Sequence, residues 1–174
     1  MGRPKIQVDD WLERAVRALA ANGLPVTVVV GAEAGAAYDR VGQVADTLDL
    51  TLTATEAEDW DEGMGASLRA ALDLALGHVE VAVLVTLVDL PDVDARVVAR
   101  LLEEPVEVGT LRRAAYAGKP GHPVVLGRDH WRGVMATAQG DRGARAYLQE
   151  REVALVECGD LATGEDVDSF SGPS

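Results

Sequence analysis

The chain has 174 residues, of which 48% are apolar and 4% aromatic, and its formal net charge is −13. This charge argues against non-specific binding to nucleic acid or to an anionic membrane, and we find neither a bilayer-spanning stretch nor a signal-peptide pattern. The single cysteine, Cys158, excludes an internal disulfide and favours a cytoplasmic protein. The length predicts one domain over residues 1–174.

The first part of the chain alternates helical and extended patterns. Apolar residues recur at helical spacing from Trp11 to Leu19, and Asn22-Gly23 supplies a stop signal. The further patterns predict a strand over 25–31, partial helix over 32–47, a strand over 50–54, an acidic loop over 56–63, a helix over 65–76, a strand over 81–88 and a helix over 94–104. This alternation predicts an α/β, Rossmann-like, doubly wound and mostly parallel sheet.

The pattern changes after residue 105. Extended stretches at 106–108, 110–116 and 123–127 surround the turn residues 118–121, which predicts a hairpin or a small β-arm. Residues 128–150 predict two short helices separated by residues 140–143, and 153–156 predicts a last strand. From residue 159 to 174 the chain reads as a polar tail.

Two aspartates follow or lie near the ends of such segments. Asp89 closes the apolar run 81–88, which is typical of a strand that is buried on both faces of a parallel sheet. Ligands of open α/β sheets bind outside the carboxyl ends of the strands, so a carboxylate at this point is well placed to hold a divalent metal. The alternative is that Asp89 only caps the next helix. The second aspartate is Asp168, near the C-terminus.

Six short segments occur in a fixed order along the chain: residues 1–5, 62–68, 87–91, 121–126, 140–145 and 166–169. Together they resemble the MobA-like nucleotidyltransferases, especially the branch of molybdenum-cofactor cytidylyltransferases. The resemblance implies a nucleotide-diphospho-sugar-transferase type of sheet that binds a nucleoside triphosphate (CTP or GTP) with Mg²⁺. It implies transfer of a nucleotidyl group to a phosphorylated acceptor of the molybdopterin type.

The resemblance also assigns roles to single residues. Asp89 and Asp168 match the family's metal positions, and Mg²⁺ prefers oxygen ligands of this kind. Lys5 would meet the phosphates as a point charge, which makes Lys5 and Asp89 the catalytic candidates. His122 would lie on the acceptor side.

The resemblance places Gly63, Gly65 and Ser67 against the base and the ribose, where absent side chains allow close approach. Each assignment has a simpler alternative. The two glycines also suit a turn that enters a helix, His122 suits an ordinary surface position, and Asp168 suits a solvated acidic tail.

The sequence departs from the family pattern at its start. The apolar first strand and the glycine-rich loop that precede the segment corresponding to residues 1–5 are not in this sequence. We therefore expect either a longer natural protein or a shortened one that serves as an inactive binding module, and weak or no activity for the chain as given. A missing central strand would leave an apolar groove, which favours association with a second copy or a partner chain. A transferase acting on sugar or polyol phosphates is a further alternative.

Overall fold

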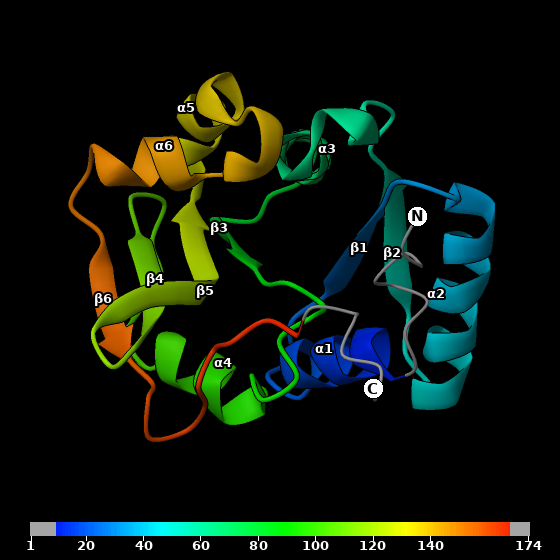
Figure 1. Ribbon diagram of the computed structural model, residues 1–174, viewed down its shortest axis with the longest axis horizontal. Coiled ribbons are helices and arrows are strands. Elements are labelled where there is room, and N and C mark those ends of the chain that lie inside the picture. The colour runs from blue at the N-terminus through cyan, green and yellow to red at the C-terminus, as the bar shows by residue number, and fades with distance from the viewer. Residues whose placement is uncertain (1–9, 168–174) are drawn as a thin grey trace, which may run out of the picture.

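The computed structural model describes residues 10–167, so Lys5 and Asp168 lie outside the described residues. The architecture is the predicted α/β type, with helices packed around sheet elements (Figure 1). No helix within residues 10–167 is both long and apolar enough to cross a bilayer. The elements in chain order are α1 (Trp11–Ala20), β1 (Val26–Val30), α2 (Ala34–Leu48), β2 (Leu52–Glu56), the 3₁₀ helix η2 (Trp60–Glu62), α3 (Met64–Leu76), β3 (Ala82–Val85), α4 (Ala95–Leu101), β4 (Leu111–Tyr116), β5 (Lys119–Gly127), α5 (Arg128–Thr137), the 3₁₀ helix η3 (Gly140–Arg142), α6 (Arg145–Gln149) and β6 (Ala154–Glu157).

Strands β1 and β2 form a parallel pair, in register from Val26 opposite Leu52 to Val30 opposite Glu56. Alternate residues of β1 are buried, and they share one apolar core with α1 and α2. The predicted helix–strand–helix–strand order of residues 11–56 is therefore confirmed.

The other four strands form a second sheet in the order β3-β5-β4-β6. Its β4–β6 ladder is parallel, whereas β5 runs antiparallel to both of its neighbours. The described ladders thus include two parallel and two antiparallel pairs, because the hairpin partner β5 lies between β3 and β4. Strand β3 is shorter than the predicted strand 81–88, and all four of its residues are only half-buried.

The predicted β-arm is the β4–β5 hairpin. Ala117 and Gly118 turn the chain with φ of 51° and 75°, which is the left-handed backbone that two-residue hairpin turns require. The carboxylate of Glu157, at the end of β6, accepts hydrogen bonds from both of these backbone N–H groups at 2.9 Å. The last strand therefore fixes the tip of the arm.

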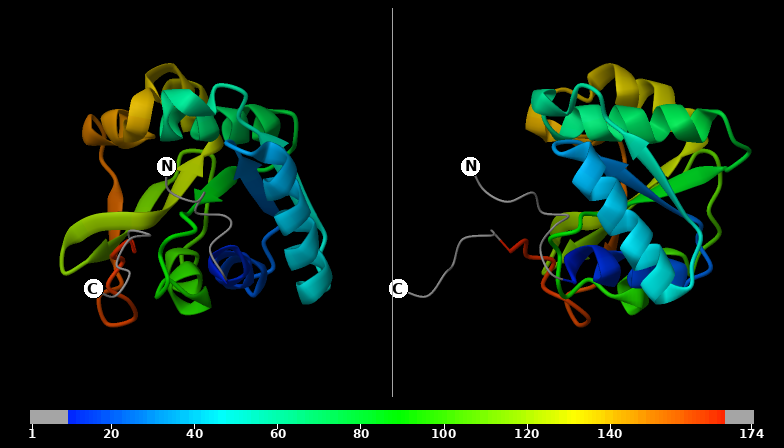
Figure 2. Two further views of the ribbon diagram at one scale, coloured as in Figure 1. Left: turned by 45° about the vertical axis from the view of Figure 1, so that its right-hand side comes forward. Right: turned by 90° about the vertical axis from the view of Figure 1, so that its right-hand side faces the viewer.

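The two sheets do not join. Among the described residues, β1 pairs only with β2 and β3 only with β5, so each has an edge without a strand beside it. Figure 2 (left) shows β1 and β2 apart from the larger sheet, with α3 lying across the upper end of the two parts. This break leaves one edge of β3 without a strand beside it, which accounts for the incomplete burial of β3.

Candidate functional site

Asp89 lies in the loop after β3 and is only 4% exposed. It does not cap the next helix. That position belongs to Asp94, whose carboxylate accepts a hydrogen bond of 2.9 Å from the backbone N–H of Arg96 in the first turn of α4. The simpler interpretation of Asp89 as the cap of the next helix is therefore wrong.

The segment after β6 returns to the loop that carries Asp89. The backbone N–H of Val167 donates to the Asp89 carbonyl oxygen at 3.0 Å. Four residues earlier, Thr163 donates from its backbone N–H and its hydroxyl to the Asp92 carboxylate at 2.5 and 2.7 Å. Residues 163–167 therefore run along residues 89–92, as the red segment does in Figure 1. Asp168 follows Val167 directly in the chain but lies outside the described residues.

Hydrogen bonds lower the pKa of Asp92 by more than burial raises it. Burial alone would raise the pKa of this carboxyl group, but the bonds from Thr163 hold the pKa below its ordinary value. Asp92 is therefore ionised near neutral pH. This contact attaches the first part of the predicted polar tail to the loop.

His122, on β5, lies close to Asp89. The β3–β5 register pairs Val85 with Val124, so the residues that precede Val124 run beside the loop that follows β3. Burial, with a further effect from the Arg113 cation, lowers the pKa of His122 to about 4, although the Asp89 carboxylate acts in the opposite direction. The imidazole is therefore neutral at pH 7, where it offers one donor and one acceptor.

The glycines at the start of α3 are covered by the protein's own backbone. A Cβ at Gly65 would lie 2.9 Å from the Ala138 carbonyl group and from the Gln139 nitrogen. Gly63 has a φ of +105°, and a Cβ there would lie 2.7 Å from the Gly140 carbonyl carbon. Packing against the loop between α5 and η3 thus accounts for Gly65, and packing against η3 accounts for Gly63. Ser67 is half-buried one turn into α3, and a role for these three residues toward a nucleotide stays a prediction.

Replacement of Gly65 by alanine is expected to lower the free energy of unfolding by about 1–3 kcal/mol, because the added methyl group must displace the backbone of residues 138–139. Urea denaturation measures this change. Gly42→Ala is the matched control. A Cβ at this position, inside α2, meets nothing within 4 Å, so the same substitution should stabilise the protein by up to about 1 kcal/mol. Equal effects at both positions would contradict the packing role.

A sequence profile described as the MobA-like NTP transferase domain matches residues 4–155, which is most of the chain. The chain belongs to the MobA-like NTP transferase family. The profile covers Asp89, His122 and the start of α3, and it ends before the segment that contacts Asp89 through Val167.

One curated relative of this MobA-like chain is named as an oxidoreductase. The protein named nicotine blue oxidoreductase, from Paenarthrobacter nicotinovorans, is 34% identical over 153 residues, which are 83% of this chain and 71% of that protein. Its name describes an oxidoreductase, whereas the family name describes a transferase. Membership in the MobA-like family supports nucleotidyl transfer in general.

Solved structures share the fold. The homologue of Mycobacterium tuberculosis Rv0371c from Mycobacterium sp. strain JC1 has a TM-score of 0.67 at 23% identity, over 97% of this chain and 83% of that one. Rv0371c from M. tuberculosis H37Rv, in a complex with manganese, has a TM-score of 0.61 at 22% identity, over 90% and 81% of the two chains. These two similarities show that the MobA-like chain has the same fold as the two solved structures.

The residues around Asp89 fit a metal that takes few protein ligands. Within residues 10–167, no three histidine, cysteine, aspartate or glutamate side chains come together as a metal site. Mg²⁺ commonly takes one or two carboxylates and completes its shell with phosphate oxygens and water. A buried carboxylate at Asp89, next to the chain that leads to Asp168, suits this type of site.

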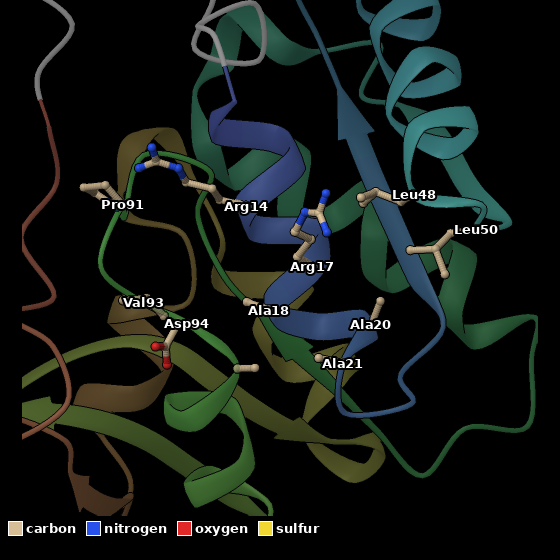
Figure 3. A pocket seen from close by; sticks show the side chains of 11 residues that line it. Arg14, Arg17, Ala18, Ala20, Ala21, Leu48, Leu50, Pro91, Val93 and Asp94 are labelled. Carbon is tan, nitrogen blue, oxygen red and sulfur yellow. The ribbon is translucent and has the colours of Figure 1, made fainter.

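One pocket among the described residues lies elsewhere. It has a volume of about 700 Å³ and lies between α1, the end of α2 and residues 91–95 (Figure 3). Its two arginines already pair within α1, Arg14 with Asp10 at 2.6 Å and Arg17 with Glu13 at 2.8 Å. None of the predicted site residues lines it, so it is not the candidate site of this MobA-like protein.

Proposed function

We propose that the protein transfers a nucleoside monophosphate from CTP or GTP to a phosphorylated acceptor of the molybdopterin type, with release of pyrophosphate. The observation that carries the proposal is the buried carboxyl group of Asp89, in the loop that the C-terminal segment contacts through Val167. Family membership supports the reaction class, while the base, the acceptor and a cytoplasmic location belong to the proposal.

The reaction is an in-line attack of an acceptor oxygen on the α-phosphorus, so the protein contributes position and charge stabilisation. Asp89 and Asp168 would hold Mg²⁺, which neutralises triphosphate charge when it is bound. Lys5 would add a positive charge at the phosphates, and residues 63–67 would lie against the nucleoside. His122 is neutral at pH 7, so it can hydrogen-bond to the acceptor without adding charge.

Thermal unfolding with CTP, GTP, ATP or UTP, each with and without Mg²⁺ or Mn²⁺, tests the proposal. We expect one triphosphate to raise the melting temperature only when metal is present, by roughly 5–10 °C at a concentration about 100-fold above its Kd. The 174-residue chain and a version extended with the upstream coding sequence are measured together. If neither binds a triphosphate, the transferase proposal fails and the inactive binding module is favoured.

The 34% identity to the relative named nicotine blue oxidoreductase favours a second candidate, oxidoreductase activity on nicotine blue. The absorbance of nicotine blue and of NADH or NADPH, incubated with the protein, measures this activity directly. Turnover of both compounds without added triphosphate would support reduction. Metal-dependent triphosphate binding with no consumption of NADH or NADPH would exclude it.

A further inference from the structure

Arg113 uses only part of its hydrogen-bonding capacity. It lies on β4 opposite Val124 of β5, and it is half-buried. Its Nε and Nη2 atoms both donate to one acceptor, the carbonyl oxygen of Gly121, at 3.0 and 2.9 Å. A guanidinium group has five N–H donors, so the Nη1 side remains without a partner among residues 10–167. This orientation fixes the side chain and leaves donors available to a ligand.

The neighbouring Arg112 shows what a purely structural arginine looks like in the same strand. Its guanidinium donates to three carbonyl oxygens, those of Leu101, Glu104 and Pro105, at 2.6 to 3.3 Å. These hydrogen bonds satisfy three backbone carbonyl oxygens at and after the C-terminal end of α4. Arg113 has one such acceptor where Arg112 has three.

The charges around Arg113 are unusual for an acidic protein. The chain has 29 acidic and 16 basic residues, yet Arg113 and Arg145 form no ion pair with a carboxylate in the described part of the chain. Instead they lie close enough for Arg145 to lower the pKa of Arg113, in addition to the larger effect of burial. Arg113 is half-buried and Arg145 is exposed, and an anion bound between two cations that repel each other stabilises both.

His122 lies close to Arg113, because the Arg113 cation contributes to the lowered pKa of the imidazole. Val124, the partner of Arg113, lies on one face of β5. This face packs on α6, where Tyr147 and Leu148 share a core with Val124. Arg145 is the first residue of α6, so Arg113 has the Arg145 cation on one side and His122 on the other strand of the hairpin.

We propose that Arg113 and Arg145, together with His122, bind the phosphate group of the acceptor substrate, an assignment that rests on the proposed nucleotidyl transfer. A phosphate monoester dianion balances the two arginine charges, and the guanidinium groups provide paired N–H donors for its oxygens. The position beside Asp89 brings the acceptor to the metal and the triphosphate. It also gives a function to Arg145 in the segment 140–145.

Titration with inorganic phosphate, followed by NMR of the arginine Nε–Hε signals, tests this site. We expect a saturable shift of the Arg113 signal in the wild-type protein. Arg145→Met should weaken phosphate binding at least about tenfold, because one charged hydrogen-bonding partner is lost. Arg132→Met, at an exposed position on α5, removes the same charge and should leave the phosphate affinity unchanged. A non-saturating shift at Arg113, or equal affinity in the Arg145→Met protein, would overturn the proposal.

A second titration separates the acceptor from the donor. The protein is first saturated with the triphosphate and metal that raise its melting temperature, and phosphate is then added. An unchanged phosphate affinity supports an acceptor site, whereas displacement of phosphate by the triphosphate would assign the arginines to the donor and overturn it. If phosphate binds but no triphosphate does, the anion site stands and the proposed transfer fails.

Discussion

Asp89→Asn is expected to remove the metal-dependent part of triphosphate binding and to lower nucleotidyl transfer at least about 100-fold. Asparagine keeps the size of the side chain and the backbone carbonyl that accepts from Val167, but it removes the negative charge that a divalent cation requires. Melting temperatures with triphosphate, with and without Mg²⁺ or Mn²⁺, measure the first effect. Pyrophosphate release measures the second.

Asp73→Asn is the matched control, because Asp73 is exposed on α3 and the substitution changes the net charge equally. We expect this variant to bind triphosphate and metal like the wild-type protein. Unfolding without ligand shows whether either variant is destabilised. A well-folded Asp89→Asn protein that retains the full metal-dependent shift would exclude Asp89 as a metal ligand.

Trp131→Ala is expected to lower the free energy of unfolding by about 3–5 kcal/mol, a large share of the total stability of a typical domain. Trp131 has no exposed surface, and it lies in the core shared by α3, β5, α5 and α6. Its indole N–H donates to the Leu126 carbonyl oxygen at 2.8 Å, so the helix is also tied to the end of β5. Urea denaturation followed by circular dichroism measures the loss.

Two further variants separate the contribution of the Trp131 hydrogen bond from the contribution of its burial. Trp131→Phe keeps most of the apolar volume and loses the hydrogen bond to Leu126, so we expect a smaller loss of about 1–3 kcal/mol. Trp60→Ala makes the same truncation at a residue that is 46% exposed, and it should cost about 1 kcal/mol or less. A loss at Trp131 no larger than the loss at Trp60 would contradict the assigned role in the core.

Local sequence patterns predicted most of the elements. Helical spacing located α1 and α3, the β-branched residues of β1 located the first strand, and the glycines after Tyr116 located the β-arm. These features depend on residues close together in the chain, so periodicity and turn chemistry are sufficient to find them. The simple placement of Asp89 after β3 follows from the same local information.

Contacts between distant residues could not be predicted in this way. The bond from Thr163 to Asp92 joins residues 71 positions apart, and nothing in either local pattern indicates it. The backbone that covers Gly65 comes from a loop more than 70 residues away. Arg113 was overlooked, although consecutive arginines within an otherwise apolar strand are a signal that could have singled it out.

The break between β1 and β3 has a consequence for motion. The core of the β1–β2 half is formed by α1 and α2, whereas the larger sheet has two cores of its own, so few backbone hydrogen bonds connect the halves. We expect each half to open as a separate cooperative unit, with amide protons of β1 and β2 exchanging with solvent deuterium sooner than those of β4 and β5. The two halves would then move relative to each other as two hinged units. A ligand that contacts both Asp89 and the β1–β2 half would slow hydrogen exchange in β1 and β2.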